Sequence, residues 1–242
     1  MVASTLITDY FAEGTHAARP VTPNVATGAT AIYFETDTLT TFAWSGTAWV
    51  QISAATGPTI VQKAAISGLA PINSVTFGAA PTNGNMLIAF ADNVGDYPHG
   101  AGWTILVQNN GGDDYATILY KIAGAGESVT QTYSNQVSVG AAVVYELANA
   151  GPSFGNITPM NFGGPYSITL PRAGGLLLGT LINEATNDLP TAVTGAVLDI
   201  SSAVGARSAQ GFHFATPTAG ANSIAYTYAA THHAYGLALA VY

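Results

Sequence analysis

The sequence predicts an all-β protein in which an N-terminal extended arm and a three-stranded β-meander precede an internally duplicated, jelly-roll-like β-sandwich. The first observation behind this prediction is that short runs of β-branched and aromatic residues alternate with turns rich in glycine and asparagine. The second is that no segment sustains a helical period of apolar residues. The third is an internal repeat, in which residues 61–150 are echoed by residues 151–242.

The arm comprises residues 1–28, which show little periodicity. Gly14, Pro20, Pro23 and Gly28 are spaced so that they interrupt any regular element. We therefore expect this arm either to be disordered or to lie on a partner.

The meander follows, with strands expected at 31–35, 40–44 and 47–52. β-Branched and aromatic residues fill these strands, and Gly, Ser and Asp occupy the turns between them. A meander of this size buries little surface by itself. Residues 1–53 are therefore predicted to pack against copies of themselves or another protein, and residues 54–60 to form a short linker.

The repeat keeps its order along the chain. Pro81–Ala89 (PTNGNMLIA) is echoed by Pro171–Gly179 (PRAGGLLLG), and Gly140–Tyr145 (GAAVVY) is echoed by Gly236–Val241 (GLALAV). Copies of this length are too long for a solenoid repeat, and each suits one half of a two-sheet sandwich. Pseudo-two-fold symmetry is expected as a result.

Each copy contains six strand candidates. Those of the first copy are 73–78, 85–91, 102–108, 115–122, 127–133 and 137–147, and those of the second are 165–170, 175–182, 194–200, 208–215, 222–229 and 234–242. The last strand is expected to lie deep in a sheet, so truncation of the C-terminus should be poorly tolerated.

The charge balance excludes several classes of partner. Charged residues make up only 7% of the 242 residues, against roughly 25% in ordinary soluble domains, and the net charge is −8. The five Lys and Arg residues are scattered, whereas nucleic acids and anionic membranes require clustered cations. The surface must therefore be hydrated through neutral hydrogen-bonding groups, or other subunits must cover part of it.

Targeting signals and cysteine chemistry are missing from the sequence. There is no cysteine, so disulfides and thiolate sites are excluded. The N-terminus lacks a basic region and a long apolar core, and the longest apolar stretch, 174–182, is too short to span a bilayer. We expect folding in a cytoplasm and no membrane insertion.

The histidine pair His232-His233 is the first candidate for chemistry. Neighbouring residues on a strand face opposite sides, so the two rings cannot easily share a metal. His213 could join one of them if strands 208–215 and 232–242 pair, but no third ligand is marked. Polar residues at a strand start are the favoured interpretation, and we predict no metal site.

Two loops carry acidic residues. Asp113 and Asp114 follow a Gly/Asn run that could present oxygen ligands to Ca²⁺, although the same residues suit any hairpin turn. Asp92, Asp96 and His99 fall in an expected loop over 92–101 with the same ambiguity.

Signatures of enzymes are absent from the sequence. The run Ala123–Gly126 precedes a strand rather than a helix, so it is a turn and not a phosphate loop. There is no nucleophile elbow, and nothing in the spacing of the thirteen acidic residues selects a catalytic pair. We predict no catalytic residue and no cofactor.

The aromatic residues are the remaining candidates for contacts. Trp103 is predicted to lie in the core of the sandwich. The predicted assembly contacts on the meander are Tyr33, Phe34, Phe42, Trp44 and Trp49. The predicted surface-contact residues in loops are Tyr97, His99, Asp113, Asp114, Phe154 and Phe162.

Two segments resemble known families. Gly28–Thr38 and Phe42–Val50 form an apolar strand, a TDT turn, an aromatic strand and a W-x-G-x-x-W return, which resembles a short module of tailed-bacteriophage structural proteins. Residues 74–147 resemble a β-sandwich repeat of phage fibres and other virion-surface proteins, through Val75–Phe77, Gly84–Ile88, Gly102–Thr104 and Val143–Glu146. The resemblance implies a short fibre, spike or decoration protein whose N-terminal region attaches to the particle, often as a trimer. No long shaft or heptad repeat accompanies these segments.

The leading hypothesis is thus a non-enzymatic virion protein displayed on the particle exterior. Its expected partners are other virion proteins, which residues 1–53 contact, and further copies of itself, with a trimer as the default. A glycan of the host surface is a further candidate for the sandwich. The alternatives are a carbohydrate-binding module and, with least support, a depolymerase that uses two of the acidic residues.

Overall fold

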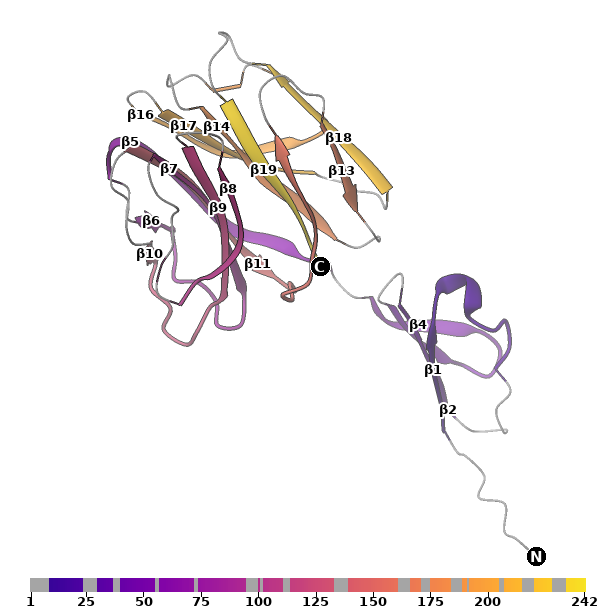
Figure 1. The fold of residues 1–242 in the computed structure, drawn as a ribbon. Coiled ribbons are helices and arrows are strands. Elements are labelled where there is room, and N and C mark those ends of the chain that lie inside the picture. The colour runs from indigo at the N-terminus through magenta and orange to yellow at the C-terminus, as the bar shows by residue number, and fades with distance from the viewer. Residues whose placement is uncertain are drawn as a thin grey trace, which may run out of the picture. The chain divides into compact units, whose positions relative to one another are not determined.

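A computed structural model provides the structure of the chain (Figure 1). It describes residues 9–23, 30–36, 40–54, 57–71, 74–94, 100, 102–110, 114–132, 139–160, 166–170, 175–183, 189–190, 192–204, 207–214, 220–227 and 234–242. Over these residues the chain is almost entirely β-strand, with one 3₁₀ turn, which confirms the predicted all-β class. None of them lies in a helix with the length and apolar composition needed to cross a bilayer.

The chain divides into two compact units. The N-terminal unit is Met1–Thr56, and the C-terminal unit comprises Gly57–Pro171 and Gly175–Tyr242. The division falls inside the predicted linker, where strand β4 (Trp49–Ala54) ends and strand β5 (Thr59–Pro71) begins.

The N-terminal unit contains a four-stranded sheet in the order β1-β2-β3-β4. Strands β2 (Thr30–Glu35), β3 (Thr40–Trp44) and β4 form the antiparallel meander that the sequence predicts. Strand β1 (Asp9–Gly14) pairs in parallel with β2. The prediction that residues 1–28 lack a regular element was therefore wrong, because a parallel edge strand depends on tertiary pairing that local composition does not reveal.

The C-terminal unit contains two five-stranded antiparallel sheets. The first has the order β5-β11-β7-β9-β8 and the second β12-β19-β14-β17-β16. The strands of the first sheet after β5 are β7 (Met86–Val94), β8 (Thr104–Asn110), β9 (Asp114–Ile122) and β11 (Val139–Ala148). Those of the second are β12 (Phe154–Met160), β14 (Leu176–Asn183), β16 (Val197–Val204), β17 (Arg207–His213) and β19 (Ala234–Val241).

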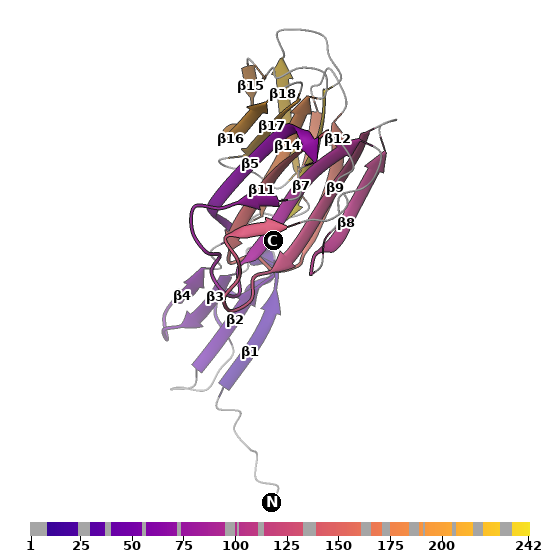
Figure 2. The ribbon, with the colours of Figure 1, turned by 90° about the vertical axis from the view of Figure 1, so that its left-hand side faces the viewer.

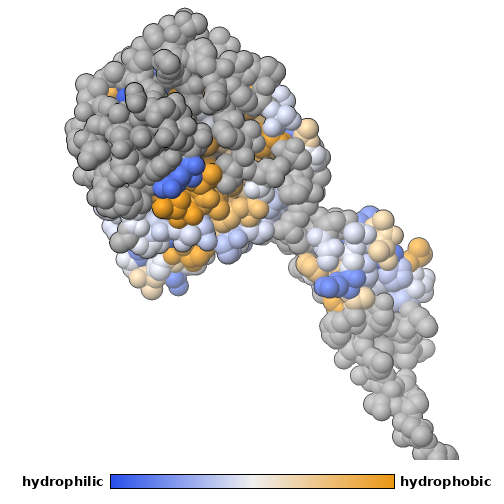
Figure 3. All heavy atoms as spheres, in the orientation of Figure 1, coloured by the Kyte–Doolittle hydropathy of each residue, from blue (hydrophilic) through white to orange (hydrophobic). Residues whose placement is uncertain are grey.

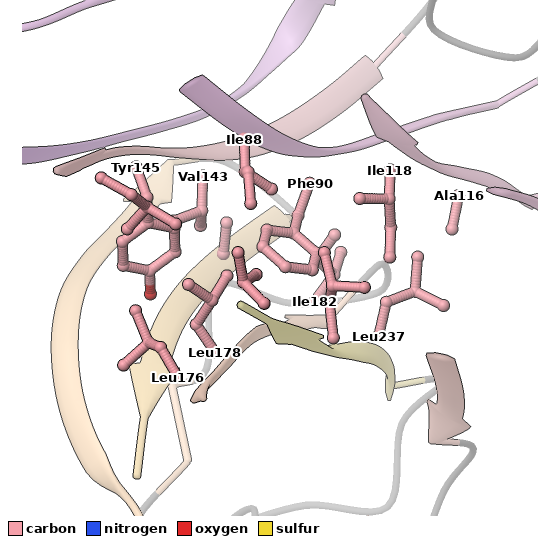
Figure 4. Close-up of a cluster of buried hydrophobic side chains, with 14 of the residues drawn as sticks. Ile88, Phe90, Ala116, Ile118, Val143, Tyr145, Leu176, Leu178, Ile182 and Leu237 are labelled. Carbon is pink, nitrogen blue, oxygen red and sulfur yellow. The ribbon is translucent and has the colours of Figure 1, made fainter. Parts of the chain in front are cut away.

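These two sheets lie face to face, as Figure 2 shows. Edge strand β5 packs against β16 and β17, β11 packs against β17, and β7 packs against β14. At the opposite side the ring of Tyr120 on β9 contacts that of Phe154 on β12, with 4.8 Å between centroids. The apolar side chains between the sheets form one core (Figure 4), whose largest fully buried members include Tyr145 and Phe90.

A smaller sheet covers the outer face of each large sheet. Strands β6 (Ser74–Thr76) and β10 (Thr130–Thr132) cover the first, over a core that includes Trp103, as predicted. Strands β13 (Tyr166–Leu170), β18 (Gly220–Thr227) and β15 (Ala192–Thr194) form the corresponding layer of the second, over a core that includes Phe212 and Ile224.

The two halves of this unit, β5–β11 and β12–β19, repeat one topology. Strands β5, β11, β7, β9 and β8 correspond in order to β12, β19, β14, β17 and β16. Even the irregularities recur, because β8 and β16 each carry a β-bulge after their second ladder pair, at Leu106 and at Asp199. The jelly-roll detail of the prediction stays a prediction.

The structural equivalence differs from the sequence echo in one strand. In the first half, Val144 pairs with Ala89. The sequence repeat aligns Val144 with Ala240 and Ala89 with Gly179, so it predicts that Ala240 pairs with Gly179. Ala240 instead pairs with Leu177. The displacement is two residues, which keeps the same side chains on the same face, and apolar composition cannot distinguish the two registers.

The first strand of each half, β5 and β12, was absent from the predicted strands. Both lie at a sheet edge, and both contain Gly and Pro residues that local reasoning assigns to turns. By contrast, β19 was predicted to lie inside a sheet. It does so between β12 and β14, and Leu239 and Val241 are fully buried.

Candidate functional site

One face of the N-terminal sheet is covered by the segment that follows β1. Glu35, at the end of β2, is buried, and its Oε1 lies 2.9 Å from His16 Nδ1 and 3.3 Å from Arg19 Nη1. The guanidinium of Arg19 lies 3.7 Å from the centroid of the Phe42 ring. A buried carboxylate thus holds the segment against the sheet through two basic side chains.

The predicted aromatic contacts contribute to the same clamp. Trp49 Nε1 donates a hydrogen bond to Pro20 O at 2.7 Å, and the Tyr33 hydroxyl donates to Thr15 O at 3.3 Å. The ring of Trp49 packs edge-on against those of Tyr33 and Trp44, with centroids 6.0 and 5.5 Å apart. Tyr33, Phe42 and Trp49 therefore contact residues of their own chain.

The opposite face of the sheet carries apolar side chains. Strand alternation and register place Ile32, Phe34, Ala43 and Val50 there, because Ile32 pairs with Ala43 and Ala43 with Val50. Val50 is 49% exposed, and the other three are partly exposed. Figure 3 shows hydrophobic residues at the surface of this unit among hydrophilic ones. Of the five predicted assembly residues, only Phe34 lies on this face.

Two of the six residues predicted as loop contacts, Asp114 and Phe154, lie in described strands, β9 and β12. Phe154 is partly buried against Tyr120, at the interface between the two large sheets. Asp114 is the first residue of β9, although its side chain lies outside the described part. Tyr97, His99, Asp113 and Phe162 lie outside the described residues, as do Asp96, His232 and His233.

A cluster of polar side chains crosses the interface between the halves at one side. The Asp199 carboxylate is fully buried at the bulge of β16, and its Oδ1 lies 2.5 Å from Lys63 Nζ and 2.9 Å from His213 Nδ1. Its Oδ2 accepts a hydrogen bond from the Tyr145 hydroxyl at 3.1 Å. Lys63 and Tyr145 come from the first half, and Asp199 and His213 from the second. We call these four residues the polar seam.

Tyr145 is the buried centre of this seam. Its hydroxyl also lies 3.4 Å from the carbonyl oxygens of Gly179 and Phe212. Burial, followed by the negative charge of Asp199, raises the pKa of the Tyr145 phenol well above its usual value. The phenol is therefore kept as a neutral donor rather than as a nucleophile or base.

Two further polar links lie on the same side. Arg207 Nη1 donates to Asp92 Oδ2 at 2.7 Å, with both side chains buried. Ser67 Oγ lies 3.1 Å from Ser202 Oγ and accepts a hydrogen bond from Val204 N. The expected loop over 92–101 was wrong for Asp92, which lies within β7 and is paired with a cation rather than available to an ion.

The proposed meeting of His213 with the C-terminal strand was also wrong. Strand β17 pairs with β14 and β16, whereas β19 lies between β12 and β14. His213 instead contacts the carboxylate of Asp199 across its own hairpin. Among the described residues, no three His, Cys, Asp or Glu side chains gather in a group that could hold a metal ion.

A further buried carboxylate, that of Glu146, accepts hydrogen bonds from residues of the first half. Its Oε1 accepts hydrogen bonds from Thr82 N at 2.8 Å and Asn85 Nδ2 at 2.6 Å, and its Oε2 accepts from Gln62 Nε2 at 2.5 Å. Burial alone would raise the pKa of this carboxyl, but the hydrogen bonds outweigh it and lower the pKa below the usual value. Glu146 thereby ties the turn around Thr82 to β11.

Sequence reasoning did not identify Lys63, Tyr145, Asp199 or Glu146. Asp199 interrupts an apolar run on an expected strand. A charged residue in such a run indicates a buried charge, which requires a partner. The partner, Lys63, lies on a strand that was not predicted. These groups form ion pairs and hydrogen bonds within the fold, and their geometry supports a structural role.

Comparison with known proteins identifies no relative, because no family model, no curated protein and no solved structure matches this chain.

Proposed function

We propose that this protein is a non-enzymatic structural component of a bacteriophage particle, a short surface appendage of the fibre, spike or decoration kind. In this proposal the N-terminal unit attaches the chain to the particle or to further copies of itself. The C-terminal sandwich is the part displayed on the exterior.

The observation that carries the proposal is the construction of the N-terminal unit. Its aromatic residues and the 15–20 segment fill one face of a small sheet, while Ile32, Phe34, Ala43 and Val50 lie on the other face. A sheet of this size gains stability when its second apolar face is also covered. An attachment or assembly surface is the use that fits this arrangement, and it agrees with the phage-like sequence pattern of the same residues.

The sandwich supports the proposal through the use it makes of its charged groups. Asp92, Glu146, Asp199 and Arg207 are buried and bound to other residues of the fold. Because these charged groups stabilise the fold, they support a scaffold role for the described part of the sandwich. No described contact favours the alternative of a carbohydrate-binding module, since Phe154 packs within the interface between the large sheets.

The test uses particles of the phage or prophage that encodes the chain. Particles purified on a density gradient are analysed by mass spectrometry for this protein, and antibodies against the sandwich are used to label intact particles. We expect a reproducible copy number and external labelling. Absence of the chain from purified particles would overturn the proposal.

A variant with Ile32→Ser, Phe34→Ser and Val50→Ser tests the attachment surface. We expect it to remain folded, to be lost from particles and, if the free chain is an oligomer, to shift to a monomer in light scattering. The control is Ile105→Ser with Val204→Ser, because these sandwich residues are exposed to an extent similar to that of Val50. The control should be incorporated like the unaltered chain.

A further inference from the structure

The polar contacts between the two halves of the sandwich lie at one side of their interface. The polar seam joins β5 and β11 of the first half to β16 and β17 of the second. Ser67–Ser202 links β5 to β16, and Asp92–Arg207 links β7 to β17. Apart from His213–Asp199, which lies within the second half, each of these contacts has one residue from each half. The opposite side is closed by the ring contact of Tyr120 with Phe154.

The strand registers identify which residues take the same places on the opposite side. Asp199 and Leu106 occupy equivalent bulges, and His213 and Tyr120 pair with the first residue of β16 and of β8 respectively. Tyr145 corresponds to Leu239, which lies fully buried in the core between the sheets.

Lys63 has an equivalent as well. Lys63 pairs with Tyr145, three residues after Ile60 and beyond an irregularity in β5. Ile157 pairs with Leu239, three residues after Phe154 and beyond an irregularity in β12. By strand register, the four positions equivalent to the polar seam are therefore Ile157, Leu239, Leu106 and Tyr120, and none of these residues carries a charge.

Side-chain size differs between the two sides in the same way. Gly211 lies beneath Tyr145, and a methyl group at Gly211 would overlap the Tyr145 hydroxyl and lie 2.8 Å from Val143 Cγ1. The position equivalent to Gly211 is Ile118, which follows the bulge in the same register. On one side of the interface the large Tyr145 therefore packs on Gly211. At the equivalent positions on the other side are two residues of similar size, Leu239 and Ile118.

We infer that this interface accepts only unlike halves, so that β5–β11 binds β12–β19 of the same chain or of a second copy, and that like halves are rejected. Two first halves would place Lys63 against Leu106 and Tyr120 with no carboxylate, and Tyr145 against Ile118. Overpacking of Tyr145, and the loss of a carboxylate partner for the partly buried Lys63, both oppose that arrangement.

Pairing of two second halves would also be unfavourable. Asp199 would face Leu239 in place of Tyr145, and an isoleucine would replace Lys63 in the sequence at the equivalent register position, so its buried carboxylate would gain neither a cation nor a hydroxyl from the other half. Leu239 over Gly211 would leave space where Tyr145 lies in the native interface. Each half of a duplicated chain has a similar apolar face. The differences in charge and side-chain size between the two faces specify that a first half pairs with a second half.

The connection between the halves permits the correct pairing to form either within a chain or between chains. Only residues 149–153 separate β11 from β12. Asn149, with φ of 55°, is the one non-glycine residue with a positive φ in the described part of the chain. Short hinges of this kind favour exchange of halves between copies when the intramolecular interface is weakened.

The test uses three full-length variants: Lys63→Asp, Asp199→Lys, and the two substitutions combined in one chain. Each single substitution opposes two like charges across the seam, and we expect the folded-to-unfolded ratio to fall about tenfold or more, since Lys63 is partly exposed and Asp199 is buried. The combined chain restores opposite charges and should recover most of that loss.

Co-refolding of the two single variants gives the decisive readout. The new carboxylate at position 63 of one chain can face the new ammonium at position 199 of the other, and the remaining interface of that pair is native. We expect a heterodimer with one chain of each kind, identified by native mass spectrometry of differently tagged chains. Each variant refolded alone should give far less dimer.

The matched control is the ion pair within the first half, Lys121 with Glu127, whose Nζ and Oε1 lie 2.8 Å apart. Lys121→Asp and Glu127→Lys should compensate within one chain but give no heterodimer when mixed. The inference is overturned if Lys63→Asp with Asp199→Lys is no more stable than either single variant. It is equally overturned if homodimers of one variant form as readily as heterodimers in the mixture.

Discussion

Asp199 occupies, in the second half of the sandwich, the bulge position that Leu106 occupies in the first. A β-bulge turns its extra residue out of the regular alternation, so the same backbone device presents a carboxylate on one side of the interface and an isobutyl group on the other. The duplicated backbone is therefore retained while the chemistry at equivalent places has diverged. Three predictions follow from buried groups of the sandwich, and a fourth concerns the N-terminal unit.

Gly211→Ala should destabilise the sandwich by about 1–3 kcal/mol, the range of overpacking substitutions. The new methyl group would overlap the Tyr145 hydroxyl and lie 2.8 Å from Val143 Cγ1, and both belong to the packed core between the sheets. Denaturant unfolding measures the loss. Gly124→Ala is the matched control, because nothing lies within 4 Å of its added carbon. An equal response of both variants would contradict the packing assigned to Gly211.

Tyr145→Phe should destabilise the protein at neutral pH by about 1 kcal/mol, since it removes a buried hydroxyl that donates to Asp199. The raised pKa of the Tyr145 phenol also predicts an alkaline effect. Below the unfolded pKa of about 10 both states are protonated, and as pH rises above it only the unfolded state ionises readily, so stability is lost.

The measurement is the free energy of unfolding at several pH values on either side of pH 10. The unaltered chain should lose stability more steeply than Tyr145→Phe above that pH. Tyr120→Phe serves as the control, because it keeps the ring that packs on Phe154. Parallel curves for the unaltered chain and Tyr145→Phe would contradict the buried, neutral phenol.

Glu146→Gln should cost about 1–3 kcal/mol at pH 7, because three donors lose a charged acceptor in a buried place. Its lowered folded pKa means that the carboxylate contributes stability above the unfolded pKa of about 4.3, which is lost as pH falls through the folded value. Acid unfolding monitored by circular dichroism should therefore be less steep in the variant. A variant with the acid dependence of the unaltered chain would exclude Glu146 as a contributor.

The sequence was sufficient to predict those parts of the fold whose cause is local. The meander strands and most sandwich strands carry β-branched and aromatic runs between turn residues, and the repeat predicted two matching sheets. Strands β1, β5 and β12 were not predicted, because each contains a Gly or Pro residue of the kind that marks a turn, and edge strands that pair on one side tolerate such residues. Their existence depends on a partner far away in the sequence.

The candidate sites were predicted less well, for a related reason. The aromatic residues of the meander were identified, yet Tyr33 and Trp49 contact a segment that was expected to lack regular structure. Asp199 and Lys63 are 136 positions apart, and only the packing of two sheets makes them neighbours. Residue type can indicate that a buried charge needs a partner, but it cannot identify which one.

The N-terminal clamp gives the last prediction. Glu35→Gln should destabilise the N-terminal unit by about 1–2 kcal/mol, because the buried carboxylate that contacts His16 and Arg19 loses its charge. Hydrogen exchange of the Ala18 and Arg19 amides measures this directly, since both donate within the clamped segment, to Thr15 O and His16 O. Glu13→Gln, on the exposed surface of β1, is the matched control and should leave exchange unchanged. Faster exchange in Glu35→Gln alone would assign the clamp to the carboxylate, whereas equal exchange in both variants would mean that the aromatic contacts of Trp49 and Phe42 suffice to hold the segment.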